Sequence, residues 1–457
     1  MTFRCRRRPW RLANVLGGGV CLVEGRIVSV IGLAFGDCGK GLFTDYLCRA
    51  RSAHTVVRFN GGAQAGHNVV LPDGRHHTFS QFGAGTFNPG VATVLSAPVV
   101  VHPTALLVEE NYLQRAGIGD ALDRLLIDAR CLVTTPYHEA AGRLRERARG
   151  AAAHGSCGVG FGETVGHALA QPEQAIRYGD LLHHSRVRNK LEAMRHYLRA
   201  ALPARAAALD RQDAAILDDP GFGLLWLEHV QRLIAKVAPF APEQVAAQLA
   251  RPGCIVMEGA QGMLLDEWHG FHPHTTWSST GPVAAEAALA GYGVSERIRH
   301  FGAMRSYLTR HGQGPMPTED QALQALAEPH NADSGWQGSF RRGHPDAVLL
   351  RYALAAAGRI EGLLVSHLDA FRGEAELRWA HSYQLHGREI RDLPLSGQPD
   401  LAHQETLCGQ LRAASPNYAD TPIANADAFV DELQSLTNLP VVIGSHGPTW
   451  QHIRTGK

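Results

Sequence analysis

A glycine-rich segment, Gly32–Gly41, holds the residues best suited to chemistry, and it follows the β-branched run Ile27–Ile31. Small residues let backbone N–H groups approach a polyphosphate, a following helix contributes its positive end, and Lys40 adds a charge. The segment differs from the common Walker pattern, because Ala34 stands six residues before Lys40 and Gly41 replaces a Mg²⁺-binding hydroxyl. The sequence therefore predicts a phosphate loop of unusual spacing. Its phosphate-binding residues would be Gly36, Gly39, Lys40 and Gly41.

An acid, Asp37, lies inside this loop. A carboxylate among phosphate-binding glycines repels the ligand unless it holds a cation or handles a proton. A second glycine-rich loop ends at Gly66 and His67. An imidazole beside a transferring phosphate can donate a proton or stabilise developing charge, and the Gly66 carbonyl can approach a metal ion. A packing or capping role for His67 stays open, but its place one βα unit after Asp37 favours a functional role.

Further polar groups follow an apolar strand. Gln261 comes shortly after the run Cys254–Met257, where a buried amide could read a base or hold a water. The hydroxyl-rich stretch that includes Thr276 offers donors to a nucleotide phosphate. Three histidines in this region could suggest zinc, but Gly270 and Pro273 separate them and exclude a helical ligand pair.

Two charged groups in the C-terminal half are less specific. Arg341 and Arg342, in the predicted loop Gly335–Gly343, could clamp a carboxylate through bidentate hydrogen bonds, although a solvated surface pair is an alternative. Asp369 follows the predicted strand Gly362–Val365 and could accept the N1 and amino hydrogens of guanine. A strand-end turn residue is the alternative for Asp369.

The order of elements predicts an α/β fold with a large, mostly parallel central sheet and helical sub-lobes. We expect a hairpin at Pro72–Arg75, strands at Ala92–Val101 and Ala303–Thr309, and a helical insertion over about 185–250. Ligands bind beyond the carboxyl ends of parallel strands, so both glycine loops should face one crevice. Residues 26–457 should form a single domain.

Composition limits the function classes. The 457 residues include 44 Lys and Arg against 43 Asp and Glu, so no net field favours a nucleic acid or a membrane. Eight scattered cysteines without a Cys-x-x-Cys pair argue against a structural zinc site and favour a reducing, cytoplasmic compartment. Residues 1–25 are basic and are interpreted as a dispensable leader. The sequence contains no apolar run of ~20 residues, so no transmembrane helix is expected.

Five motifs, taken in order, resemble those of the adenylosuccinate synthetase family. They are Gly36–Gly41, Arg58–His67, Glu258–Gly262, Thr309–Glu319 and Leu368–Asp369. The resemblance covers about residues 27–450. It implies a homodimeric ligase that uses GTP and Mg²⁺ to phosphorylate the 6-oxygen of IMP, a purine nucleoside monophosphate. The amine of aspartate then displaces the phosphate.

The resemblance also implies roles for single residues. Asp37 matches the base that removes the purine N1 proton and touches Mg²⁺, and His67 matches the acid that faces the γ-phosphate. Gln261 matches the amide that steadies the activated purine, and Gly66 matches a carbonyl ligand of Mg²⁺. The implied GTP-binding residues are Gly36, Gly39, Lys40, Gly41, Asp369, Ser445 and Gly447, and Thr276 matches a hydroxyl that holds the monophosphate.

Departures from the family pattern fall on the expected substrate sites. Gln64 is one methylene longer than the family's asparagine, Cys157 replaces a hydroxyl that holds monophosphate, and Phe161–Ile176 lacks the paired arginines. The donor loop keeps only Arg341 and Arg342 of four arginines. Cys38 and His367 also depart from the pattern. We therefore expect a ligase whose machinery is kept, with IMP or a related nucleotide as the acceptor and aspartate or a related amino acid as the amine donor.

Two other classes of function stay open. A catalytically reduced paralogue that serves as a sensor or assembly subunit would bind nucleotide without turnover. A plain hydrolase would release GDP without any purine acceptor.

Overall fold

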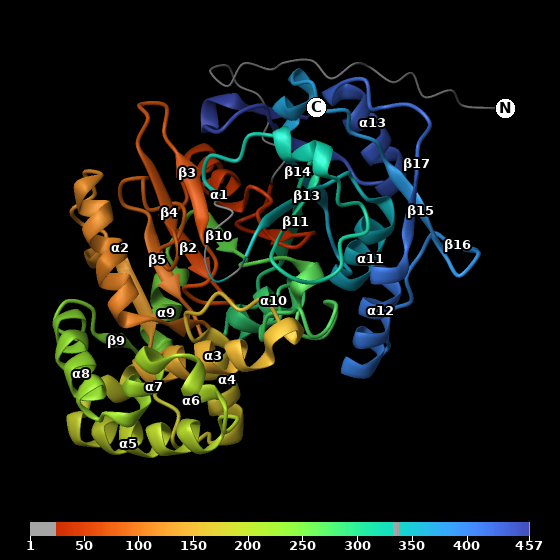
Figure 1. The fold of residues 1–457 in the computed structure, drawn as a ribbon. Helices are drawn as coiled ribbons and strands as arrows, with labels where there is room; N and C mark the ends of the chain where they lie inside the picture. The colour runs from red at the N-terminus through yellow and green to blue at the C-terminus, as the bar shows by residue number, and fades with distance from the viewer. Residues whose placement is uncertain (1–23, 332–335, 337, 457) are drawn as a thin grey trace.

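The computed structural model describes residues 24–331, 336 and 338–456, and it confirms the α/β fold (Figure 1). Ten strands form one sheet in the order β19-β18-β14-β11-β1-β10-β2-β5-β7-β9. All neighbouring pairs are parallel except β18 and β19. Their bounds are β1 (Ile27–Gly32), β2 (Thr55–Arg58), β5 (Ala92–Leu95), β7 (Leu125–Asp128), β9 (Pro239–Phe240), β10 (Ile255–Glu258), β11 (Ile298–Arg305), β14 (Gly362–Ser366), β18 (Val441–Ser445) and β19 (Ile453–Thr455).

Smaller sheets lie around the central one. The expected hairpin at Pro72–Arg75 is confirmed, because it joins the antiparallel strands β3 and β4. Another antiparallel pair is β12 and β13, and β15 lies between β16 and β17. The bounds are β3 (His67–Val70), β4 (His76–Phe79), β6 (Val100–Val101), β8 (Leu132–Val133), β12 (Leu308–His311), β13 (Phe340–Gly343), β15 (Ala380–Leu385), β16 (Arg388–Ile390) and β17 (Ser415–Tyr418).

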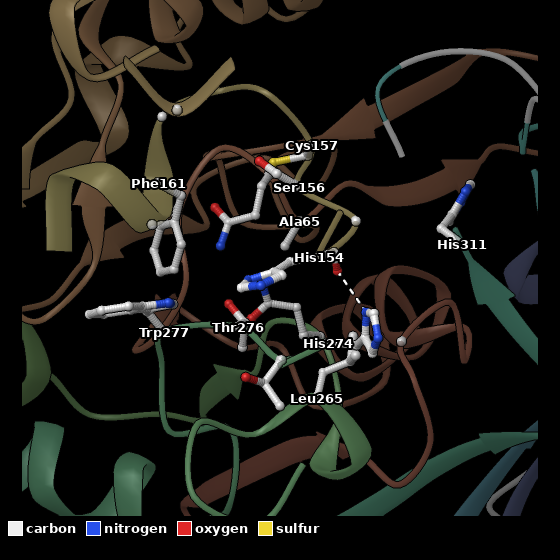
Figure 2. A pocket seen from close by; sticks show the side chains of 18 of the residues that line it. Ala65, His154, Ser156, Cys157, Phe161, Leu265, His274, Thr276, Trp277 and His311 are labelled. Carbon is white, nitrogen blue, oxygen red and sulfur yellow. Dashed lines mark hydrogen bonds between the residues drawn. The ribbon is translucent and has the colours of Figure 1, made fainter. Parts of the chain in front are cut away.

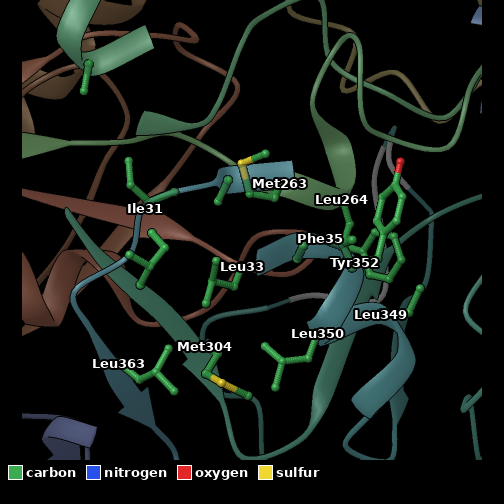
Figure 3. Close-up of a cluster of buried hydrophobic side chains, with 14 of the residues drawn as sticks. Ile31, Leu33, Phe35, Met263, Leu264, Met304, Leu349, Leu350, Tyr352 and Leu363 are labelled. Carbon is green, nitrogen blue, oxygen red and sulfur yellow. The ribbon is translucent and has the colours of Figure 1, made fainter. Parts of the chain in front are cut away.

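Helices cover both faces of the sheet, which explains why β1 is apolar at nearly every position. Val28 and Val30 pack in one cluster with Phe43 of α1. Ile31 belongs to the cluster on the other face with Leu349 of α11, as Figure 3 shows. A strand buried on both faces needs a continuous apolar run rather than alternation. The helices nearest these clusters are α1 (Lys40–Ala50), α10 (Pro282–Ala290), α11 (Ala347–Ala357), α12 (Leu401–Ala413) and α13 (Ala426–Thr437).

The expected helical insertion is present: its helices α5 to α8 gather at one end of the molecule, while the last, α9, packs against the central sheet (Figure 1). Its helices are α5 (His184–Ala200), α6 (Ala206–Leu209), α7 (Arg211–Asp218), α8 (Gly221–Ile234) and α9 (Pro242–Leu249). The insertion is not purely helical, because β9 inside it pairs with β7 at the sheet edge. It packs beside the earlier helices α2 (Pro103–Arg115), α3 (Pro136–Arg149) and α4 (Phe161–Ala170).

Three local predictions need correction. The expected strand Ala92–Val101 divides into β5 and β6, since Pro98 between them lacks the N–H that a ladder requires. The expected strand Ala303–Thr309 divides into β11 and β12, because Ser306 turns the chain and its hydroxyl donates to the His367 carbonyl. Residues 340–343 of the predicted arginine loop form β13, paired with β12.

No helix among the described residues is long and apolar enough to cross a membrane. Residues 1–23 of the predicted leader lie outside the described residues.

Candidate active site

The two glycine loops meet at the carboxyl ends of the strands. At Gly41, in the first turn of α1, a Cβ atom would lie 2.7 Å from the carbonyl oxygen of Asn68 and 3.0 Å from the carbonyl carbon of His67. The helix can therefore approach β3 this closely only because position 41 has no side chain. This contact places His67 directly beside the phosphate loop.

A cavity of about 590 Å³ opens between these loops. Nine of the predicted site residues line it: Gly36, Asp37, Lys40, Gln64, Gly66, His67, Cys157, Gln261 and Thr276. Figure 2 shows Phe161 and Trp277 next to each other on one side and His311 on the other. The sequence prediction that both loops face one crevice is confirmed.

Lys40 is buried and points toward the segment after β10. Its Nζ donates to the Gln261 carbonyl at 2.6 Å and lies 3.6 Å from Cys38 Sγ. An ammonium group held by a carbonyl and a thiol has no anionic partner at these contacts, so it can pair with a phosphate. This geometry agrees with a phosphate-binding lysine.

His67 forms a buried pair with Glu258, the last residue of β10. His67 Nδ1 lies 2.6 Å from Glu258 Oε1, and the Ala84 N–H donates to Glu258 Oε2 at 2.9 Å. Burial alone would raise the pKa of Glu258, but His67, Arg58 and the Ala84 N–H outweigh it and hold the pKa below its ordinary value. A carboxylate without a proton requires Nδ1 to donate, so the second nitrogen of His67 is directed elsewhere.

The reactive side of His67 is its Nε2, which is buried without a hydrogen-bond partner among the described residues. Burial lowers the pKa of His67 to about 4, against the attraction of Glu258. At neutral pH the ring is therefore neutral, with a lone pair on Nε2. An unpartnered polar atom in a cavity lining marks a place for a ligand group.

Two amides in the lining also lack partners. Gln261 Oε1 and both amide atoms of Gln64 are buried without a hydrogen bond among the described residues. Gln261 has a positive φ of 59°, a strained backbone conformation for a residue with a side chain. Unpaired buried amides cost stability, so their presence suggests that a bound molecule completes them.

Asp37 is held in an unusual backbone conformation from outside its own loop. Its φ is 49°, and its carbonyl accepts a hydrogen bond from Arg305 Nε. Arg305 pairs in turn with buried Glu328, which also accepts from the Tyr307 hydroxyl at 2.6 Å and from Asn331 Nδ2 at 2.8 Å. The side chain of Asp37 itself remains about one quarter exposed toward the cavity.

Replacing Glu328 with glutamine is expected to destabilise the protein by about 3 kcal/mol at pH 7, because Arg305 would stay buried without a counter-charge. Burial alone would raise the pKa of Glu328, but Arg305 and His367 lower it to about 2. The stabilisation is therefore present above the ordinary pKa of 4.5 and is lost as the pH falls toward 2. Denaturant unfolding of parent and Glu328→Gln should show a stability gap that closes over this range.

The matched control is Glu376→Gln, which removes an exposed partner of Arg378. Exposed ion pairs contribute little, so this variant should unfold like the parent at each pH. A gap for Glu328→Gln that does not depend on pH would contradict the assignment.

The predicted guanine-binding residues lie together but outside the large cavity. Asp369 follows β14, and Ser445 and Gly447 lie at the end of the neighbouring strand β18. A Cβ on Gly39 would lie 2.7 Å from the Ser366 side chain, so the end of β14 touches the phosphate loop. Ser445 donates to the Gly447 carbonyl at 2.6 Å, which folds this loop on itself. The residues predicted to bind guanine therefore adjoin the loop predicted to bind phosphate, and both roles stay predictions.

Arg341 and Arg342 are not brought to the large cavity. Arg341 pairs with Glu319 at 2.7 Å and donates to the Gly314 carbonyl, while Arg342 is buried against Gln324. Both guanidinium groups thus have internal partners, and a role in binding a carboxylate stays a prediction.

A Mg²⁺ ion fits the donor set of the cavity. Mg²⁺ keeps several waters and binds through one or two carboxylates plus substrate phosphates. Asp37 offers a carboxylate, and the exposed residue Gly66 offers a backbone carbonyl, in the same lining. Among the described residues, no group of three or more His, Cys, Asp or Glu side chains is arranged to hold a metal ion.

Sequence reasoning missed four residues of the site. They are Arg305, Glu328, His311 and, in its role as the partner of His67, Glu258. Glu258 carried a usable signal, because an acid that ends an apolar strand must find a partner when buried. The other three depend on contacts between distant segments.

Comparison with known proteins identifies the family. The sequence profile of adenylosuccinate synthetase matches residues 29–454. The adenylosuccinate synthetases of Neisseria gonorrhoeae and Halorhodospira halophila are each 33% identical to this chain. The alignments cover 92% and 93% of this chain and 96% and 97% of those proteins.

Solved structures share the fold. The fully ligated adenylosuccinate synthetase of Plasmodium falciparum superposes with a TM-score of 0.76 at 20% identity, over 95% of this chain and all of that one. A cyanophage S-2L succinoaminodeoxyadenylate synthetase, bound to dGMP and dATP, gives a TM-score of 0.59 at 17% identity, over 94% of each chain. The chain therefore belongs to the adenylosuccinate synthetase family, whose members are C–N ligases that use GTP and Mg²⁺ to join aspartate to IMP.

Proposed function

We propose that this chain phosphorylates the 6-oxygen of a purine nucleoside monophosphate with GTP and then joins an amino acid amine to C6. The acceptor is IMP or a related nucleotide, and the donor is aspartate or a related amino acid. The observation that carries the proposal is the convergence of Asp37, Lys40, His67 and Gln261 on one cavity, with His67 Nε2 and Gln261 Oε1 unpartnered.

Each of these side chains has a distinct task in the proposal. Asp37 removes the N1 proton of the lactam, which makes O6 a nucleophile toward the γ-phosphorus of GTP. Lys40 holds the polyphosphate, and His67 Nε2 faces the transferred phosphoryl group. Gln261 steadies the activated purine through its side-chain amide, whose N–H groups can donate to purine acceptors. Mg²⁺, held by Asp37 and Gly66, would neutralise phosphate charge.

The residues proposed for the acceptor and donor sites are the ones predicted from the sequence. Gln64, Cys157 and Thr276 line the cavity and are proposed to hold the nucleotide acceptor, with Asp369, Ser445 and Gly447 on the guanine of GTP. Arg341 and Arg342 are proposed to reach the donor carboxylate, which requires each to exchange its present partner. Without these arginine contacts, a donor with two carboxylates, such as aspartate, would bind weakly.

The proposal is tested by incubating the protein with GTP, Mg²⁺, IMP or dGMP, and aspartate. GDP release and the purine absorbance are followed together, and each component is omitted in turn. Ligation requires that GDP release depend on the purine acceptor. GDP release without an acceptor would identify a hydrolase instead, and no turnover across a panel of nucleotides and amino acids would overturn the proposal.

GTP binding is expected to take up a proton at His67. Burial holds the pKa of His67 at about 4 without ligand, and an adjacent polyphosphate favours the charged ring and so raises this pKa. Calorimetric titration with GTP and Mg²⁺ in buffers of different ionisation enthalpy should show net uptake near pH 6. The uptake should disappear in His67→Gln, and equal uptake in that variant would assign the proton elsewhere.

A nucleotide-binding sensor is the second candidate. It is favoured by the internal partners of Arg341 and Arg342, which leave no free guanidinium of this pair for a donor. Calorimetry separates the two functions: GTP affinity unchanged in Asp37→Ala and His67→Ala, with no turnover by the parent, would support the sensor.

We further propose that the chain forms a homodimer, functions in the cytoplasm and folds over residues 26–457 as one domain with a dispensable leader at 1–25. Sedimentation of the full chain and of a variant lacking residues 1–25 tests the oligomeric state and the leader, a single cooperative unfolding transition tests the single domain, and cell fractionation tests the compartment.

A further inference from the structure

The loop that carries Cys157, a predicted contact of the acceptor's monophosphate, uses its backbone donors within the protein. The N–H groups of Gly155 and Ser156 both donate to Glu146 Oε1, at 2.7 and 3.0 Å. The N–H of Gly158 donates to Ser156 Oγ at 3.2 Å. A buried carboxylate of α3 therefore occupies backbone donors that an acceptor phosphate would otherwise use.

The arginines of the cavity lining are paired or enclosed. Glu146 Oε2 accepts from Arg149 Nη1 at 2.7 Å, and Glu163 holds Arg145 with both oxygens, at 2.8 and 3.3 Å. Arg310 is 2% exposed and donates to three backbone carbonyls. Among the described residues that line the cavity, no arginine is both accessible and without a partner.

The surroundings of this loop are neutral and aromatic. Burial lowers the pKa of His167 and of His274 to about 4, so both rings are neutral at pH 7. A Cβ on Gly166 would lie 3.8 Å from the ring of Trp277, which therefore lies along α4, and Phe161 is next to it (Figure 2). Aromatic faces carry negative potential, so they disfavour an anion such as phosphate.

A row of side chains connects this end of the cavity to the reacting centre. A Cβ on Gly61 would lie 3.6 Å from Gln261 Oε1 and 3.8 Å from Gln64 Nε2. A Cβ on Gly62 would lie 3.1 Å from Gln64 Oε1 and 3.2 Å from Phe161 Cδ2. An acceptor with its purine at Gln261 therefore extends past Gln64 toward Phe161. The unpartnered amide of Gln64 offers a neutral donor and acceptor to sugar hydroxyl groups.

We propose that this chain also ligates 6-oxopurine nucleosides, such as inosine, about as efficiently as the corresponding monophosphates. The inference rests on the proposed ligase function and adds a class of acceptor at the same site. A 5′-hydroxyl is satisfied by neutral partners such as Gln64 and Thr276, whereas a phosphate gains affinity chiefly from cations. A hydrogen bond to a charged group contributes about one to two powers of ten, so a 5′-phosphate without such bonds adds little.

The bond changes are those of the proposed ligation, and the 5′ group takes no part in them. The purine O6 bonds to the γ-phosphorus while the N1 proton passes to Asp37, and GDP leaves with the electron pair of the broken P–O bond. The lone pair of the donor amine then forms the bond to C6, and phosphate leaves with the electron pair of the broken C6–O bond. Of the two protons lost by the donor ammonium, one leaves on phosphate. The other reaches solvent, as does the proton taken by Asp37.

The test compares inosine with IMP as acceptor at saturating GTP, Mg²⁺ and aspartate. GDP release and purine absorbance give kcat/KM for each acceptor. The value for inosine should lie within about tenfold of the value for IMP, because binding energy from the 5′ group would enter this ratio directly. A larger preference for IMP would overturn the inference.

The Glu146→Gln variant tests the role of the buried carboxylate. Glutamine keeps an oxygen for the two loop N–H groups but releases Arg149 as a cation in the cavity lining. The preference for IMP over inosine should therefore rise by about tenfold. Glu192→Gln is the matched control, because it breaks the same i,i+3 pairing with Arg195 outside the cavity, and it should keep the parental preference.

A second variant adds a cation without altering the loop. Trp277 is 51% exposed, so Trp277→Arg should fold normally, and it places a guanidinium directly after Thr276. Its preference for IMP should rise by about 10–100-fold. A parental preference in both folded variants would overturn the placement of the 5′ group at this end of the cavity. Absence of turnover with either acceptor in the parent would instead overturn the proposed function, so the two failures are distinguishable.

Discussion

Asp37→Asn is expected to lower kcat by about 10³-fold or more while the protein stays folded. The amide has the shape of the carboxylate but cannot accept the N1 proton, so the 6-oxygen never becomes a strong nucleophile. The support of this loop is not disturbed, because Arg305 bonds the backbone carbonyl of Asp37 and not its side chain. The loss should therefore appear in kcat and in GTP isotope exchange alike.

The measurement is steady-state turnover together with thermal unfolding. Asp45→Asn is the control, since Asp45 is a buried acid of α1 that pairs with Arg49 and Asn88 and does not line the cavity. It should lose stability and keep kcat. If Asp37→Asn turned over like the parent, the carboxylate would have no part in proton removal.

The phosphate loop could be predicted because its signals are local. A β-branched strand, small residues and a following helix occupy neighbouring positions, and Lys40 follows directly. The sheet then brings Gln261 and His67 to the same edge, because parallel strands place their carboxyl ends together. This rule accounts for the residues of the two glycine loops and for Gln261, whereas Cys157 in the lining was implied by the family resemblance.

The partners of these residues could not be predicted in the same way. Glu258 is 191 positions from His67, and Arg305 is 268 positions from Asp37. Such contacts depend on strand order, and the order places β10 and β11 on either side of β1. No sequence feature near Glu328 indicates that it pairs with Arg305.

Arg341 and Arg342 show how a sequence pattern can suggest the wrong structural environment for a side chain. A glycine-rich stretch with two cations resembles a mobile anion-binding loop, but Arg341 and Arg342 lie on β13. Pairing with β12 fixes their directions, and Glu319 and Gln324 are within reach. The side-chain partners of a short two-stranded ribbon depend on register, which one strand alone does not specify.

Glu258→Gln is expected to affect both stability and catalysis, because its two neighbours are both donors. Glu258 accepts from His67 Nδ1 and from the Ala84 N–H, one on each oxygen. Glutamine has a single acceptor oxygen, so one of these donors must lose its partner in a fully buried site. A buried donor without a partner costs about 1–3 kcal/mol, which denaturant unfolding at pH 7 should detect.

The catalytic loss in Glu258→Gln should exceed what the instability explains. The carboxylate holds His67 in the form with hydrogen on Nδ1 and compensates the charge that forms when Nε2 gains a proton. Without it, the proton uptake on GTP binding should disappear and kcat should fall by about 10²–10⁴-fold, with the KM for the amine donor little changed. Glu110→Gln, which alters a buried acid of α2 outside the cavity, should leave kcat unchanged. Parental proton uptake in Glu258→Gln would show that His67 is oriented by its packing and not by this carboxylate.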